Sequence, residues 1–413
     1  MTVRNGGHRV VVTGLGVVTP IGQFVPDFWA ALQRGQCGVT EVTGIPEDDL
    51  KIKIAAQIKD FDPRARLRHF KRDKLILHAD RYSWFAAAAA DEAMKQAGLE
   101  IPVANPYRTA CIVGSGAGGL VTFENSYRDL FIAHKKATNP LTLLRIIGSS
   151  ASAHIGIEFG VKGPTFATCS ACSTAAHAVG IARDYIKHGV VDVAIAGASE
   201  AVINYGTMKA WQALHVLSPE GCFPFAKKRN GTVLGEGAGI LVLESYEHAK
   251  ARGATILAEL VGYGSTSDSK DMVNPDTEGP REAMKMALAD AHLTPSDIGY
   301  LNAHGTATTI NDRNETKAIK EVFGAQAEKL PISSTKSMHG HPLGAGGGIE
   351  AVATIMAIRE GFLPPTIGLD EADPECDLDY VPNVGRKKAI RHAMSNSFAF
   401  GGLNAVLVFG PAP

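Results

Sequence analysis

The chain has 413 residues, of which 45% are hydrophobic and 20% charged, so it can bury one large core or two merged ones. Its formal net charge of −1 provides no overall field that would attract nucleic acid or a membrane surface. No apolar run approaches the length of a membrane span, and residues 1–7 lack the apolar core of a secretory signal. The six cysteines are scattered and form no disulfide framework, so a reduced, cytoplasmic location is expected.

The first part of the chain predicts buried strands that alternate with helices. Residues 8–13 form an apolar, β-branched run that ends in Gly14-Leu-Gly16, which indicates a strand followed by a turn. Because the third glycine of a dinucleotide-binding fingerprint is missing, this pattern gives little support to a Rossmann site. Further strands are predicted at 110–114, 190–197 and 240–244, and helices at 26–33, 81–96 and 140–159.

A second series of alternating elements begins at residue 256. No linker or low-complexity tract separates it from the first series, and no internal repeat is evident. Strands are predicted at 256–262, 298–303, 330–334 and 404–409, and helices at about 280–292, 312–323 and 344–360. Strands that alternate with helices predict a layered α/β architecture.

The stretch 163–180 carries the strongest chemical signal. An extended approach gives way at Ser173 to the spacing of a helix that ends at Gly189. Cys172 therefore lies at a strand-to-helix turn, where unpaired backbone N–H groups and the helix dipole stabilise a thiolate. The small neighbour Ala171 leaves room for a carbonyl group to approach the sulfur. The position is typical of a nucleophile.

On its own, Cys169-Ser-Ala-Cys172 is also compatible with two buried structural thiols, a redox pair or half of a metal site. No second C-x-x-C motif and no close histidine pair completes a zinc set, which argues against a metal centre. Two downstream motifs favour the nucleophile, namely Asn302-Ala-His304-Gly-Thr306-Ala-Thr308 and Ser334-Thr-Lys336-Ser-Met-His-Gly-His341.

In order and spacing, these motifs resemble those of the β-ketoacyl-[acyl-carrier-protein] synthases, specifically the elongating type II class with a Cys-His-His site. The resemblance extends from Val10-Val-Val-Thr-Gly14 to Asn396-Ser-Phe398-Ala-Phe400-Gly-Gly402. It implies an α/β thiolase fold built from duplicated α/β/α/β/α layered halves. The N-terminal half, residues 1–253, would carry the nucleophile, and the C-terminal half, residues 254–413, would carry both histidines.

The implied reaction is a decarboxylative Claisen condensation of an acyl group held on Cys172 with malonyl-[acyl-carrier-protein]. It would extend a fatty-acyl, polyene or polyketide chain by two carbons. Such chemistry needs a nucleophile to hold the acyl group, a carbanion, and stabilisation of two oxyanions. By resemblance, His304 and His341 hydrogen-bond the enolate, and the backbone N–H groups of Cys172 and Phe400 form the oxyanion hole for the acyl carbonyl.

The resemblance also implies supporting roles. Lys336 would order the two histidines electrostatically, with Glu350 as its partner, because a buried lysine needs one. Thr306 and Thr308 match positions that hydrogen-bond a phosphopantetheine arm. The carrier protein supplies that arm, so no separate cofactor and no metal are expected.

Two further regions bear on the acyl chain. Phe398 and Phe400 match a gating loop, whose glycines would let Phe400 swing between covering and opening the acyl pocket. Ala117 stands where the fatty-acid enzymes have an isoleucine that pushes into the acyl tunnel, so a wider or deeper tunnel is expected.

Other positions depart from the family pattern without removing a catalytic group. They include Ala399, Leu403, Asp271, Val273 and His339. Together they point away from the housekeeping enzyme and towards a specialised lipid, polyene, polyketide or nodulation-type synthase.

The expected partners are an acyl carrier protein, malonyl and acyl thioesters, and a second copy of the chain. Residues 140–159 are apolar on more than one face and are expected at a two-fold interface; a heterodimer with a related subunit is the alternative. A non-catalytic chain-length-factor-like subunit is the competing function, but such a subunit lacks the nucleophile. A degradative thiolase or an initiating Cys-His-Asn synthase would show different histidine contexts.

Overall fold

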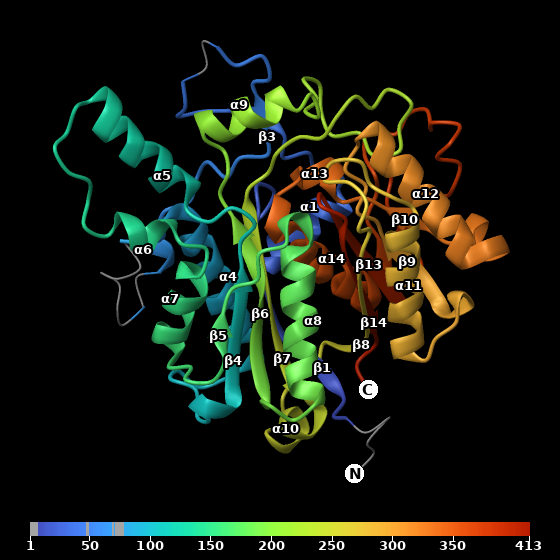
Figure 1. Cartoon of the computed structure of the whole chain (residues 1–413). Helices are drawn as coiled ribbons and strands as arrows, with labels where there is room; N and C mark the ends of the chain where they lie inside the picture. The colour runs from blue at the N-terminus through green and yellow to red at the C-terminus, as the bar shows by residue number, and fades with distance from the viewer. Residues whose placement is uncertain (1–6, 47–48, 68–69, 71–77) are drawn as a thin grey trace.

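The computed structural model describes residues 7–46, 49–67, 70 and 78–413. The prediction that the chain has no secretory signal was drawn from residues 1–7, and of these only residue 7 is among the described residues. Within the described residues, a ten-stranded sheet with the order β10-β9-β13-β14-β8-β1-β7-β6-β4-β5 runs through the molecule (Figure 1). Its strands are β1 (Val10–Val18), β4 (Thr109–Gly114), β5 (Thr165–Phe166), β6 (Val193–Glu200), β7 (Gly237–Ser245), β8 (Ala258–Ser267), β9 (Ile298–Asn302), β10 (Ile332–Ser333), β13 (His392–Ala399) and β14 (Leu403–Gly410).

The strand pairs at the two ends of the sheet are parallel, and those in the middle are antiparallel. Because β1 pairs with both β7 and β8, one continuous sheet joins the two parts of the chain. The main helices are α1 (Val25–Gln33), α4 (Arg81–Ala97), α5 (Leu120–Tyr127), α6 (Thr142–Ile146), α7 (Ser150–Phe159), α8 (Thr174–Lys187), α9 (Tyr205–Ala213), α10 (Tyr246–Ala251), α11 (Glu278–Ala291), α12 (Thr309–Phe323), α13 (Lys336–His339) and α14 (Gly346–Glu360).

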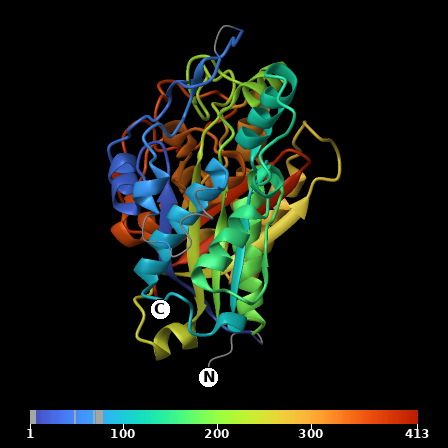
Figure 2. The same cartoon turned by 90° about the vertical axis from the view of Figure 1, so that its left-hand side faces the viewer.

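The helices form layers on both faces of the strands (Figures 1 and 2). Helices α8 and α14 pack against each other in the middle, α8 over β4 and β6 and α14 over β7 and β13. Helices α4 and α7 cover the outer face of the N-terminal strands, and α11 covers β8 and β14. The predicted layered α/β arrangement is therefore present, and its central helices lead towards one end of the molecule, where the site lies.

The predicted turn at Gly14-Leu-Gly16 is wrong, because β1 continues through both glycines to Val18. The glycines serve close packing against the alanine-rich helix α4. A Cβ atom at Gly14 would lie 2.0 Å from the Ala93 carbonyl oxygen, and one at Gly16 would lie 1.9 Å from that of Ala89. Because Gly14 and Gly16 have no side chains, the backbone of α4 can approach the strand closely at these two positions.

The single helix predicted over 140–159 is also wrong. The segment forms α6 and α7, and the backbone between them becomes extended at Ile147 (φ −62°, ψ 134°). Helix α5, the segment that follows it and helix α6 form an arm, residues 120–146, on one side of the molecule (Figure 1). Large apolar side chains on this arm are exposed, among them Phe131, Leu143 and Leu144. Among the described helices, none has both the length and the hydropathy that crossing a bilayer requires.

Candidate active site

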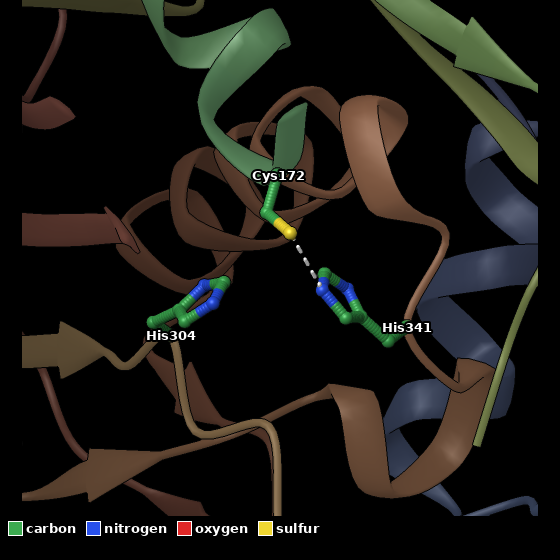
Figure 3. Close-up of side chains that lie close together, drawn as sticks. All are labelled: Cys172, His304 and His341. Carbon is green, nitrogen blue, oxygen red and sulfur yellow. Dashed lines mark hydrogen bonds between the residues drawn. The ribbon is translucent and has the colours of Figure 1, made fainter. Parts of the chain in front are cut away.

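Three side chains from separate parts of the chain meet at one point (Figure 3). Cys172 lies in a 3₁₀ turn directly before α8, His304 follows β9, and His341 follows α13. The Nε2 atom of His341 is 3.1 Å from the Cys172 sulfur. The ring centroids of the two histidines are 5.5 Å apart and the rings are nearly perpendicular, at 84°. All three side chains are buried.

The turn that presents Cys172 is held in a sparsely populated conformation. Ala171 has φ +47°, a region that residues with a Cβ atom rarely adopt. The Ser173 hydroxyl lies 2.8 Å from the Ser397 carbonyl oxygen and 2.7 Å from that of Leu403, which ties the turn to the β13–β14 hairpin. Cys169 lies earlier in the approach and is exposed. The structure thus places Cys172, and not Cys169, among the histidines.

The electrostatic setting of Cys172 differs from the sequence expectation of a resting thiolate. Burial raises the pKa of the Cys172 thiol to about 12, against the lowering effects of the Lys336 ammonium and the backbone N–H of Phe400. A helix N-terminus favours a thiolate only where the loss of hydration is small. Burial therefore favours the protonated thiol at Cys172.

Both histidines are held neutral. Burial lowers the pKa of His304 well below 6.5, and the positive charge of Lys336 adds to the effect. The same two causes lower the pKa of His341. The Lys336 ammonium lies 3.5 Å from Nδ1 of His304. Because an ammonium only donates, Nδ1 is the acceptor and Nε2 carries the proton.

Lys336 and Glu350 form a buried ion pair behind the histidines. Their side chains are each 1% exposed, and Lys336 Nζ donates to Glu350 Oε1. Burial raises the pKa of Glu350, although Lys336 acts in the opposite direction. Among the described residues, the second carboxylate oxygen of Glu350 has no hydrogen-bond partner. The predicted partnership is therefore present in the structure.

Two buried acids that the sequence motifs did not reveal shape the turn after β9. Glu315 accepts hydrogen bonds from the backbone N–H groups of His304 at 2.9 Å and Gly305 at 2.8 Å. Asp312 accepts from the backbone N–H of Ala307 at 3.2 Å. Both acids lie on the buried face of α12, three residues apart. Acidic residues on the apolar face of an amphipathic helix were the signal that could have found them.

Glu200, at the end of β6, is a further buried residue that sequence analysis missed. Its carboxylate accepts from the Ser115 hydroxyl at 2.7 Å and from the backbone N–H groups of Gly116 at 2.9 Å, Ala117 at 3.3 Å and Gly344 at 3.0 Å. It therefore joins the loop that carries Ala117 to the segment after His341. Burial raises the pKa of Glu200 to about 7.

A cavity of about 240 Å³ leads from the three side chains to the surface. Thr306, Thr308, Phe398 and Phe400 line it, and the two threonine hydroxyls are 3.0 Å apart. The structure thus brings these predicted residues to one channel. Ala117 does not line this cavity, and its place in an acyl tunnel stays a prediction.

The sequence spacing suggested no metal set, yet folding brings three potential ligands together. The sulfur and ring nitrogens of Cys172, His304 and His341 all lie within 4.8 Å of one another. Thiolate and imidazole suit zinc. The Lys336 ammonium beside His304 places a positive charge next to any bound cation, which opposes such binding.

Comparison with known proteins is consistent with this geometry. The profile described as "Beta-ketoacyl synthase, N-terminal domain" matches residues 7–249, and that described as "Beta-ketoacyl synthase, C-terminal domain" matches residues 257–370. The chain belongs to the β-ketoacyl synthase family. Both histidines fall in the second matched region and Cys172 falls in the first.

Individual ketosynthases resemble the chain over nearly its whole length. It is 45% identical over 402 residues to nodulation protein E of Rhizobium sp. (strain N33), covering 97% of this chain and 99% of that protein. It is 41% identical over 408 residues to 3-oxoacyl-[acyl-carrier-protein] synthase 2 of Staphylococcus aureus (strain COL), covering 97% and 98%. The solved ishigamide ketosynthase/chain length factor matches with a TM-score of 0.94 at 34% identity, over 98% of this chain and 100% of that one. The predicted family and thiolase fold are confirmed.

Proposed function

We propose that this protein is an elongating ketosynthase, which joins an acyl group held on Cys172 to a malonyl unit carried by an acyl carrier protein. One observation carries the proposal: the Cys172 sulfur lies 3.1 Å from Nε2 of His341, with His304 beside it, at the buried end of a channel. The chain also has 41% identity to a 3-oxoacyl-[acyl-carrier-protein] synthase. A non-catalytic chain-length factor would have no use for this nucleophile.

The first step transfers the acyl group. The sulfur of Cys172 attacks the acyl thioester of the carrier, a new thioester bond forms, and the bond to the carrier sulfur breaks. His341 is placed to take the thiol proton at Nε2 and to pass it to the departing carrier thiolate. The backbone N–H groups of Cys172 and Phe400 both act on the sulfur and are our proposed oxyanion hole for the acyl carbonyl.

The second step forms the carbon–carbon bond. The malonyl thioester loses its carboxylate as CO₂, and the electrons of the broken bond pass to an enolate. Neutral His304, with its proton on Nε2, offers an N–H donor to the enolate oxygen, and neutral His341 does so in the tautomer that carries its ring proton on Nε2, so no strong base is needed nearby. The enolate carbon attacks the acyl group on Cys172, and the sulfur leaves. The product is a β-ketoacyl chain, longer by two carbons, on the carrier.

The channel wall, the relatives of the chain and its free cysteines bear on the substrate and the location of the enzyme. Thr306 and Thr308 on the channel wall are placed to hydrogen-bond the carrier's phosphopantetheine arm, and no separate cofactor is needed. The similarity to nodulation protein E supports a specialised acyl chain rather than a housekeeping one. All six cysteines are free, which suits a cytoplasmic enzyme.

We propose further that the chain forms a homodimer through this arm, residues 120–146, and the adjoining helix α7. The exposed apolar side chains there, including Phe131, Leu143 and Leu144, need a partner surface. We expect an interface that exceeds the ~1,600 Å² of standard complexes. Light scattering would test this proposal, and a stable monomer at micromolar concentration would contradict it. A heterodimer with a related subunit is the other arrangement to look for.

The experiment that tests the function separates its two steps. His304→Ala and His341→Ala should each lose decarboxylation of malonyl carrier and condensation. Transfer of the acyl group to the enzyme, followed by intact-protein mass, should survive better, and most clearly in His304→Ala because His341 still faces the sulfur. Lys227→Met, which removes an exposed lysine of a surface ion pair, is the control. Equal loss of acyl transfer and decarboxylation in both variants would contradict the division of roles.

A further inference from the structure

The side chain of Phe400 does not stand alone at the channel. Its ring stacks on the indole of Trp211 in α9, with ring centroids 5.8 Å apart and an angle of 26° between the planes. Both rings line the cavity that ends at Cys172, and both are half-buried. No motif in the sequence pointed to Trp211, because it lies 189 positions before its partner.

Phe400 lies at the tip of the β13–β14 hairpin, where the chain turns through Gly401 and Gly402. Both glycines have positive φ, +81° and +71°, so the tip has backbone conformations that other residues adopt only with strain. Its backbone contacts one neighbouring loop: Gly401 N–H donates to the Met272 carbonyl at 2.9 Å, and Gly402 accepts from Asp268 N–H at 2.9 Å. The ring of Phe400 makes its aromatic contact with α9.

Side-chain hydrogen bonds at both ends of helix α9 hold the helix that carries Trp211 in place. The Asn204 side chain caps its first turn by accepting from Thr207 N–H at 2.9 Å. Near the other end, the Gln212 side chain accepts from Lys51 N–H at 3.0 Å and donates to the Ile52 carbonyl at 3.3 Å. These bonds hold the residue next to Trp211 against another loop. The indole therefore cannot follow Phe400 freely if the hairpin tip moves.

The ring and the backbone N–H of Phe400 serve different purposes in one residue. The N–H acts on the Cys172 sulfur, where it lowers the thiol pKa. Rotation of the tip that takes the ring off Trp211 would also redirect this N–H. The stack therefore couples the position of the ring over the channel to the alignment of the proposed oxyanion donor.

We propose that Trp211 is a positioning residue, a latch that holds the Phe400 ring in place before an acyl group is bound, so that the Phe400 N–H faces the sulfur when the acyl group is transferred to Cys172. The inference rests on the proposed function. Behind the latch, Ile203, Met208 and Leu343 form an apolar cluster with Cys172. An acyl chain that enters this cluster has to displace the Phe400 ring, and the stack with Trp211 restores it afterwards.

Kinetics provide one test of the latch. An aromatic stack is worth roughly a two- to tenfold change in a population. Trp211→Ala should lower the rate of acyl transfer to Cys172 at saturating acyl carrier by about that factor, and Trp211→Phe should restore it. Trp29→Phe is the matched control, because Trp29 makes an edge contact with Phe362 away from the channel. Acyl transfer to Trp211→Ala at the parent rate would overturn the proposal.

A spectroscopic test reads the contact without catalysis. The chain has three tryptophans, so ¹⁹F spectra of fluorotryptophan-labelled protein contain three resonances, assigned by single replacements. Phe400→Ala and acylation of Cys172 should each shift the Trp211 resonance and leave those of Trp29 and Trp84 in place. An unshifted Trp211 resonance in Phe400→Ala would disprove the stack. Failure of Cys172 to take an acyl group would instead disprove the proposed function, and the Phe400→Ala comparison would still report on the latch.

Discussion

Two buried glutamates, Glu244 in β7 and Glu350 in α14, each face a cation but have opposite shifts in pKa. Glu244 accepts from Arg252 at 2.5 and 2.8 Å, from Thr13 at 2.5 Å, and lies 2.6 Å from His248. Burial alone would raise its pKa, but these partners hold it at about 2. Among the described residues, the Glu350 carboxylate has Lys336 as its one hydrogen-bond partner, and burial raises its pKa.

The two ion pairs contribute differently to the protein. The group around Glu244 fills the hydrogen-bonding capacity of a buried carboxylate, so the pair stabilises the fold. The Lys336–Glu350 pair leaves one carboxylate oxygen without a partner among the described residues, so its burial costs stability. What it provides is a positive charge 3.5 Å from Nδ1 of His304, in the place where we propose that an enolate forms. One region serves stability and the other serves chemistry.

The largest expected effect comes from removing the site's charge. Lys336→Met keeps much of the side-chain volume but loses the ammonium, and we expect decarboxylation and condensation to fall about a hundredfold. Lys336→Met alone leaves the Glu350 carboxylate buried without its cation, so stability is compared in the double variant Lys336→Met/Glu350→Met. Its free energy of unfolding should change by less than about 1 kcal/mol, because replacing a whole buried ion pair by apolar side chains is often nearly neutral. Steady-state rates and urea unfolding check both statements. A double variant that unfolds readily would contradict the comparison.

Replacing Glu244 in β7 should have the opposite result, namely a loss of stability without a loss of activity. Glu244→Gln should lower the free energy of unfolding by about 3 kcal/mol at neutral pH, because it breaks a buried, paired charge. The condensation rate per folded molecule should stay unchanged. The pKa falls from 4.5 to about 2 on folding, so the stabilisation is complete above pH 4.5 and is lost as the pH falls towards 2. Urea unfolding of parent and variant should therefore converge over that acidic range.

A chain-length effect of several-fold is expected at Ala117, away from both glutamates. Ala117→Ile adds volume to the loop held by Glu200. Each buried methylene is worth roughly 0.8 kcal/mol, so excluding one carbon of an acyl chain should cost about fourfold in rate. Assays with a ladder of acyl carriers should show that short chains are retained while long or rigid polyene chains are lost. Identical profiles would mean that another side chain, such as Phe166 or Phe398, already fills the space.

The smallest effect is a pH profile that stays flat. Because the pKa values of His304 and His341 lie well below 6.5, their neutral forms persist between about pH 6 and 8. The single-turnover decarboxylation rate should not fall through imidazole protonation in that range. In Lys336→Met the loss of the positive charge raises both histidine pKa values, so the acid limb should move to higher pH. An acid limb centred near 6.5 in the parent would contradict the burial argument.

How much the sequence could predict depends on whether a contact is local. The Asn-Ala-His-Gly turn places His304 after a strand, and the Ser-Thr-Lys-Ser motif places Lys336 near His341, so short motifs revealed these residues. Glu200, Glu315 and Trp211 act on segments far away in the chain or on backbone N–H groups, which leave no motif. Their roles become visible only when the fold brings the segments together.

The errors have the same physical origin. The pattern around Gly14 and Gly16 is compatible with a turn or with close packing, and only the position of α4 distinguishes them. The helix N-terminus suggested a thiolate at Cys172, but sequence does not show how completely the sulfur is buried. The division into halves at residue 253 and the catalytic roles of individual residues stay predictions.

Cys172, and not Cys169, is expected to hold the acyl group. The most direct test of this expectation is peptide mapping of the enzyme after incubation with a labelled acyl carrier, in the parent and in Cys172→Ala and Cys169→Ala. We expect one acyl adduct on the peptide that contains both cysteines, assigned to Cys172 by fragmentation. It should be absent from Cys172→Ala and retained in Cys169→Ala. An adduct on Cys169, or full labelling of Cys172→Ala, would contradict the account.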